Sequence, residues 1–208
     1  MAERDGAELP VAESDDLGRY LEDTITIDWQ TPTVMECAQG LLADVTDPEE
    51  RLRRLFVFVR DEVAHSLDVS PERVTCRASE VLKEGHGLCY AKSHLLAALL
   101  RIAGLPSGFA YVRMADAERR GRFVLHGVSA VRWPATAEWI FLDASGRKGG
   151  PRTECRLSPP FSLAAWPDPE AGEGFLPFVY RRPGKRVIDL LERAPDFATV
   201  IRNLPDAL

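Results

Sequence analysis

The sequence predicts an α+β fold in which a buried helix packs against an antiparallel sheet. Two patterns support this class. Apolar residues from Leu95 to Ala103 recur at helical spacing, whereas apolar and polar residues alternate with a strand period after Gly104. The chain has 208 residues and is 45% hydrophobic, so it is large enough to bury a core as one domain.

Charge is distributed unevenly along the chain. Residues 1–18 hold six acidic side chains against a single arginine, and most of the formal net charge of −6 therefore lies there. We expect this stretch to be a flexible acidic tail and residues 19–208 to form one domain with its core at about 50–150. The sequence lacks the basic stripe that nucleic-acid binding needs. One short basic cluster is interpreted as a solvated turn: Arg181, Arg182, Lys185 and Arg186.

The first twenty residues have no basic start followed by an apolar run, and no stretch approaches the length of a membrane span. We therefore expect a cytoplasmic protein that binds neither membranes nor nucleic acids. In a reducing compartment the cysteines are expected to be free thiols, because they show no short paired spacing. There are four of them: Cys37, Cys76, Cys89 and Cys155.

Before the central helix, the sequence predicts one strand and two helices. Residues 23–29 alternate around Ile27 and predict a strand with one buried face. Residues 33–44 carry apolar residues on one side and predict a helix. A second helix is expected over 47–63, where Asp47 is placed to cap the first turn.

His65 follows this second helix, and a surface or C-terminal capping role is expected for it. A short helix is predicted over 79–84, ended by Gly85. The long buried helix starts near Cys89 and is expected to close at Gly104 in a left-handed conformation.

After the buried helix, three strands joined by short turns predict an antiparallel meander. The proline-rich stretch 145–184 is expected to wrap over the domain, and two helices are expected to end the chain. The strands lie near 109–114, 123–132 and 138–143, and the helices at 187–193 and 196–204.

Cys89 is the candidate nucleophile because it falls in the first turn of the buried helix. Unpaired backbone N–H groups and the positive end of the helix dipole favour a thiolate at that position. A cysteine is made nucleophilic near neutral pH in this way. Gly85 and Gly87 leave room for a substrate near the sulfur. If Cys89 is considered without its possible partners, the alternative interpretation is a buried structural thiol.

A cysteine nucleophile needs a base, and the base needs a group that orients it. His126 lies on the second predicted strand, and Asp143 lies at the end of the third. Neighbouring antiparallel strands bring such side chains together. A structural histidine and a turn-forming aspartate are the alternatives for these two residues.

Three blocks in this order resemble the bacterial branch of the transglutaminase-like superfamily. They are Gly87-Leu-Cys-Tyr-Ala-Lys-Ser-His-Leu-Leu-Ala-Ala-Leu-Leu-Arg-Ile-Ala-Gly-Leu-Pro106, Leu125-His-Gly-Val-Ser-Ala-Val131 and Trp139-Ile-Phe-Leu-Asp-Ala-Ser-Gly146. The resemblance covers about residues 50–150. It implies a papain-like α+β fold in which Cys89 is the nucleophile, His126 the general base and acid, and Asp143 the orienting residue.

The sequence departs from the pattern of many family members after the histidine and after the aspartate. Gly127 and Val128 stand where an aromatic residue and an acid are common, and Ala144 stands where proline is common. These changes keep the triad but remove the basis for assigning a substrate by analogy. Tyr90, which follows the nucleophile, is expected either to line the site or to pack beneath it.

The triad implies an acyl-thioester mechanism that requires no cofactor or metal. We expect a cysteine-dependent amidase or peptidase acting on a peptide, protein or small amide. Transfer of the acyl group to an amine, as in a transglutaminase, is the alternative, and a catalytically silent binding module is a third. A zinc site that uses His86, His94 and Cys89 is disfavoured because His94 is rotated away from Cys89 on the helix.

Overall fold

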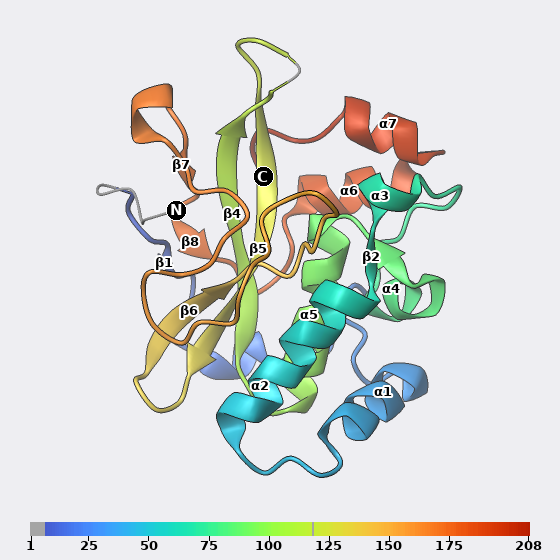
Figure 1. Cartoon of the computed structure of the whole chain (residues 1–208), viewed down its shortest axis with the longest axis vertical. Coiled ribbons are helices and arrows are strands. Elements are labelled where there is room, and N and C mark those ends of the chain that lie inside the picture. Colours follow the sequence, from blue (N-terminus) through green and yellow to red (C-terminus); the bar gives the residue numbers. More distant parts are fainter. Residues whose placement is uncertain (1–6, 118) are drawn as a thin grey trace.

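Helices gather on one side of a curled sheet in this computed structural model, which describes residues 7–117 and 119–208 (Figure 1). The model has the mixed α+β class that the sequence predicts. None of the helices in the described ranges combines the length and the apolar character that a membrane crossing requires.

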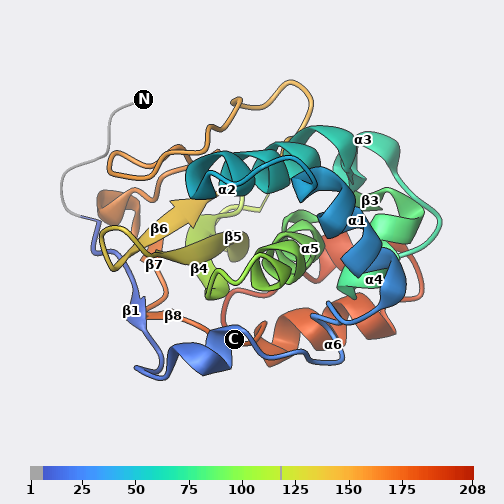
Figure 2. The same ribbon diagram turned by 90° about the horizontal axis from the view of Figure 1, so that it is seen from below.

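Helix α5 (Cys89–Ile102) lies at the centre of the molecule. Thirteen of its fourteen residues are buried, so the rest of the protein covers almost its whole circumference. Figure 2 shows α2 (Pro48–Val57) and α6 (Lys185–Arg193) on opposite sides of α5 and the sheet on a third side. Beyond the end of the helix, Gly104 has a φ of 77°, the left-handed conformation predicted for it.

Helix α2, which lies beside α5, begins at a residue suited to a helix start. Asp47 caps α2, and its carboxylate accepts a hydrogen bond of 2.8 Å from the backbone N–H of Glu50. A π-helical turn, η2 (Phe58–Glu62), extends α2. Besides α5 and η2, the helices are η1 (Leu17–Tyr20), α1 (Pro32–Leu42), α2 (Pro48–Val57), α3 (Ser66–Val69), α4 (Ala78–Glu84), η3 (Pro169–Ala171), α6 (Lys185–Arg193) and α7 (Phe197–Arg202).

The main sheet has the strand order β6-β5-β4-β7, and each neighbouring pair is antiparallel. The predicted meander of three strands is therefore confirmed. The fourth strand, β7, is short and comes from the proline-rich segment, which crosses the front of the sheet in Figure 1. The strands are β4 (Ser107–Ala115), β5 (Phe123–Trp133), β6 (Glu138–Leu142) and β7 (Gly174–Phe175).

Two small parallel pairs join distant parts of the chain. Strand β2 (Ala64–His65) pairs with β3 (His86–Gly87) directly before α5. Strand β1 (Val11–Ala12) pairs with β8 (Phe178–Val179). The stretch predicted to be a flexible acidic tail therefore contributes β1, and η1 begins within it at Leu17. Residues 1–6 of that tail lie outside the described residues.

The strand predicted over 23–29 is wrong. These residues form turns, and Ile25 is 73% exposed whereas Ile27 is fully buried. The side chain of Thr24 accepts a hydrogen bond of 3.0 Å from the backbone N–H of Ile27. Threonine side chains that bond the nearby backbone in this way compete with strand pairing, and the local bond prevails here.

A contact between Tyr90 and Gly127 fixes the start of α5 against β5. The Tyr90 side chain is 1% exposed, and its hydroxyl donates a hydrogen bond to the Leu125 carbonyl. A Cβ atom at Gly127 would lie 2.8 Å from Cδ1 of the Tyr90 ring, which is closer than real contacts allow. The ring therefore needs a glycine at this point of β5, and Tyr90 packs beneath the site rather than lining it.

We expect Gly127→Ala to lower the free energy of unfolding by about 1–3 kcal/mol, because the added methyl overpacks the buried Tyr90 ring. Gly40→Ala is the matched control. Gly40 lies inside α1 with open space around its Cα, and alanine there should raise stability by about 0.5–1 kcal/mol. Denaturant titration measures both changes. Equal midpoints for Gly127→Ala and the wild type would contradict the packing account.

Candidate active site

Cys89 is the first residue of α5, as the sequence predicts. The preceding residue, Leu88, has an extended backbone and occupies the N-cap position without a side-chain cap. Backbone N–H groups of the first helical turn have no partner within the helix, so the sulfur lies beside hydrogen-bond donors. Cys89 is 8% exposed, which leaves a small opening to solvent.

His126 lies on β5, where its Cα pairs in register with Val112 of β4. Its Nε2 atom is 2.8 Å from Oδ2 of Asp143, and its side chain is 18% exposed. The other ring nitrogen, Nδ1, is left for Cys89, whose side chain interacts with the ring. Burial disfavours the charged ring, but the carboxylate and the thiol together raise the pKa of His126 well above its ordinary value.

Asp143 directly follows β6 and is fully buried. Its Oδ1 accepts a hydrogen bond of 3.0 Å from the Ser145 backbone N–H. Its Oδ2 accepts one of 2.8 Å from the Ala164 N–H and also binds His126. Burial raises the pKa of this carboxyl, but the charge of His126 and the three hydrogen bonds outweigh it and lower the pKa below its usual value.

The three residues predicted from sequence are thus brought together by α5, β5 and the end of β6. A cysteine at a helix start, a histidine on a strand and a buried carboxylate behind it form a chain of three side chains. This order is what nucleophile, base and orienting group require. Their catalytic roles are argued below as a proposal.

A second layer behind Asp143 is not predicted from the sequence. The Thr153 hydroxyl donates to the backbone carbonyl of Asp143, and the Arg60 guanidinium donates 2.6 Å to the carbonyl of Thr153. Arg60 is 8% exposed and forms an ion pair of 2.7 Å with Asp61. The proline-rich segment therefore supplies backbone and side-chain partners that hold Asp143.

Lys92 is a buried charged residue beside the site, and the sequence carries a signal for it. It lies one turn after Cys89 in a helix that is mostly apolar, and it is fully buried. A lysine inside such a helix must find acceptors, because an unpaired buried charge is costly. Lys92 donates to three backbone carbonyls.

The three other histidines have separate surroundings. The His94 ring is fully buried, and its Nδ1 lies 2.7 Å from the carbonyl of Cys76. His86 Nδ1 lies 3.3 Å from the Ser66 hydroxyl. Within residues 7–117 and 119–208, no group of three His, Cys, Asp or Glu side chains is arranged to hold a metal.

His65 does not have the surface or C-terminal capping role that the sequence predicts for it. It is 5% exposed and caps the start of α3, where its Nδ1 accepts a hydrogen bond of 3.2 Å from the Leu67 N–H. Its Cα pairs with Gly87, two residues before Cys89. Burial and the nearby charge of Lys92 lower the pKa of His65 to about 4, so this ring is neutral at neutral pH.

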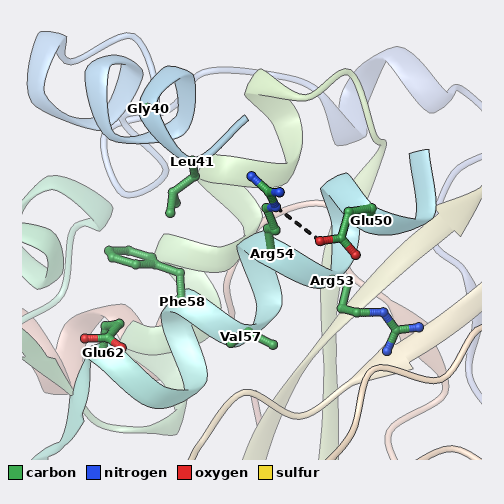
Figure 3. Close-up of a pocket in the computed structure, with 8 residues that line it drawn as sticks. All are labelled: Gly40, Leu41, Glu50, Arg53, Arg54, Val57, Phe58 and Glu62. Carbon is green, nitrogen blue, oxygen red and sulfur yellow. Dashed lines mark hydrogen bonds and ion pairs between the residues drawn. The ribbon is translucent and has the colours of Figure 1, made fainter. Parts of the chain in front are cut away.

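A surface pocket between α1 and α2 contains none of the three candidate residues (Figure 3). Both of its arginines are already paired: Arg54 lies 3.1 Å from Glu50, and Arg53 lies 2.7 Å from Glu49. The candidate chemistry therefore lies at the start of α5 and not in this pocket.

A cysteine at the start of a buried helix, facing a histidine–carboxylate pair on an antiparallel sheet, defines the papain-like class of site. The sequence model that describes the transglutaminase-like superfamily core matches residues 36–144, just over half of the chain. The chain belongs to this superfamily, and the predicted resemblance is confirmed. The comparison with curated proteins found no match.

Several solved structures are similar to this chain at low identity. One, described as a candidate cysteine protease from Cytophaga hutchinsonii, is 15% identical with a TM-score of 0.50; the match covers 66% of this chain and 46% of that one. The periplasmic domain of TgpA from Pseudomonas aeruginosa is 18% identical with a TM-score of 0.46, covering 62% and 48%. A structure named as a TGase is 15% identical with a TM-score of 0.41, covering 71% and 37%. This chain matches less than half the length of each.

The geometry predicts that Cys89 reacts with alkylating agents faster than the other three cysteines. Burial raises the pKa of Cys76 to about 12 and that of Cys155 to about 11, and it also raises the pKa of Cys37. Those thiols stay protonated near neutral pH and react slowly. With iodoacetamide at pH 6, peptide mass spectrometry should show stoichiometric labelling of Cys89 that is lost in His126→Ala. Equal, slow labelling of all four cysteines would contradict this.

Asp143→Asn is expected to lower the pKa of His126, because burial then opposes the charged ring without the carboxylate to compensate. In the wild type the ring should remain protonated as the pH rises through 6.5 and lose its proton only at higher pH. NMR titration of the ring carbon protons measures this. His65 is the internal control and should stay neutral from pH 5 to 8 in both proteins. Titration of His126 at the same pH in both proteins would contradict the assignment.

Proposed function

We propose that this protein is a cysteine-dependent acyl hydrolase of the amidase or peptidase type. The hydrogen bond of 2.8 Å between His126 and the buried Asp143 carries the proposal, because it leaves the second ring nitrogen for Cys89. Membership of a superfamily that includes cysteine enzymes supports it. The expected substrate is a peptide, a protein or a small amide.

In the proposed first half-reaction, Cys89 attacks the acyl carbonyl as a thiolate and His126 holds the proton. A C–S bond forms and the C–N bond breaks, and His126 gives its proton to the departing amine. The product on the enzyme is an acyl-thioester at Cys89. Asp143 keeps the Nε2 side of the ring occupied, so that Nδ1 performs both proton transfers.

In the second half-reaction, His126 takes a proton from water, and the resulting hydroxide attacks the thioester. The C–S bond breaks, the acid is released and the thiolate is restored. The oxyanion that forms in each half-reaction needs donors fixed in advance. The backbone N–H of Cys89 supports this role because it lies in the first turn of α5, where it has no partner within the helix.

Acyl transfer to an amine is the second candidate, since the same thioester can react with an amine in place of water. It is favoured by the same superfamily membership. A catalytically silent binding module is a third candidate, and the intact arrangement of three residues argues against it. Cytoplasmic localisation and the absence of membrane and nucleic-acid partners remain predictions.

The proposal is tested by turnover of a glutamine peptide in the presence of a labelled amine. We expect release of ammonia and free acid, with little amine incorporated. Cys89→Ala should remove all turnover, and His126→Ala should lower kcat by about 10²–10⁴-fold. Cys37→Ala, on α1, is the matched control and should match the wild type. Incorporation of amine beyond acid release would favour transfer, and full turnover by Cys89→Ala would overturn the proposal.

A further inference from the structure

Lys92 is a buried cation held by backbone carbonyls alone. Its Nζ lies 2.6 Å from the Val63 carbonyl, 2.8 Å from that of Ser145 and 3.3 Å from that of Arg60. An ammonium group has three N–H donors and no acceptor, so three carbonyls satisfy it fully. Within the described part of the chain, no carboxylate forms an ion pair with Lys92.

These three carbonyls belong to the segments that frame the candidate active site. Arg60 and Val63 lie in and just after η2, and Val63 leads into β2. Ser145 comes two residues after Asp143, and its N–H donates 3.0 Å to Oδ1 of that carboxylate. Ser145 therefore links the two groups, with its N–H on Asp143 and its carbonyl on Lys92.

Gly146 shows independently that little free space lies between η2 and the chain that follows Asp143. Its φ is 59°, and a Cβ atom there would lie 2.1 Å from the backbone oxygen of Arg60. The chain after Asp143 therefore runs backbone to backbone against η2. The Lys92 ammonium bridges the same two segments from the side of α5, one helical turn from Cys89.

The energetic cost of this arrangement indicates that it does more than fill space. Burial lowers the pKa of Lys92 to about 8, although Asp143, Asp61 and Asp68 partly oppose the shift. An apolar side chain of similar length would avoid that desolvation cost. Such an apolar side chain, however, could not donate hydrogen bonds to three carbonyls and so hold them at a common point.

We propose that Lys92 is a positioning residue for the reaction at Cys89. Its ammonium fixes Ser145, and through the Ser145 N–H it fixes the Asp143 carboxylate at the distance from α5 that brings His126 to the sulfur. The inference rests on the function proposed above. It adds a fourth residue, which positions the other three.

The ammonium form is needed because a neutral amine has two donors and a lone pair. On deprotonation, one of the three carbonyls loses its partner and faces that lone pair. The activity is therefore expected to fall as the pH rises through about 8, where this ammonium loses its proton. The charged and titratable groups that interact with Lys92 come from η2, β2, α3, the end of β6 and α5: Asp61, His65, Asp68, Asp143 and Cys89.

The first test compares Lys92→Met with Lys83→Met, the same substitution on the exposed face of α4. Both proteins are assayed on the glutamine peptide at a temperature where circular dichroism shows them folded. Lys92→Met should lower kcat by about 10- to 100-fold with KM within about threefold, as expected when reacting groups are misplaced. Lys83→Met should match the wild type. An unchanged kcat in folded Lys92→Met would overturn the proposal.

The second test uses the wild-type chain and so does not depend on whether Lys92→Met folds. In protein labelled with ¹⁵N-lysine and ¹⁵N-histidine, NMR follows Lys92 Nζ and the His126 Nε2–H resonance across pH 6 to 10. The two signals should change together, with a shared step near pH 8. Lys92→Arg, which keeps the charge, should lose that step in the His126 signal. A His126 signal that ignores the Lys92 titration would overturn the proposal.

These tests separate the two proposals. If Cys89→Ala abolishes turnover and Lys92→Met does not affect it, the acyl hydrolase stands and the positioning role fails. If the wild type shows no turnover dependent on Cys89, the hydrolase fails, while the coupled NMR titration still decides whether Lys92 positions His126.

Discussion

A buried carboxylate stays ionised only where hydrogen-bond donors and positive charge surround it, and the candidate site depends on that condition being met at Asp143. His126, the Ser145 N–H and the Ala164 N–H supply the donors. These partners come from β5, from the turn after β6 and from the proline-rich segment. The segment that looks like a loose wrap in the sequence is therefore part of what keeps the histidine oriented.

The same condition explains why α5 can be buried along its length and still present a polar site at its start. Its apolar residues pack against the sheet and the surrounding helices. Its one buried lysine is satisfied by carbonyls from η2 and from the chain after β6. The Tyr90 ring also packs closely against Gly127, and this contact fixes the start of the helix against β5. Packing and polar satisfaction thus fix the same three elements relative to one another.

The sequence was sufficient for the elements with strong periodicity or clear end signals. The burial of α5, the Asp47 cap, the stop at Gly85 and the meander followed from local patterns. Alternation in residues 23–29 predicts a strand, but that pattern does not reveal that the Thr24 side chain accepts a hydrogen bond from the Ile27 N–H. The site residues followed from their order and from the family resemblance. The partners of Lys92, Thr153 and Ala164 could not be predicted, because they are backbone carbonyls and, for Ala164, the Asp143 carboxylate, which only the tertiary fold brings close.

The central claim is that Cys89 carries the acyl group during turnover. Mixing the protein with an activated ester, quenching with acid within the first turnover and analysing the peptides by mass spectrometry tests this most directly. The account predicts an acyl adduct on the Cys89 peptide that decays on the time scale of product release and is absent in Cys89→Ala. An adduct on another residue, or product formation without any adduct in a protein that lacks Cys89, would contradict it.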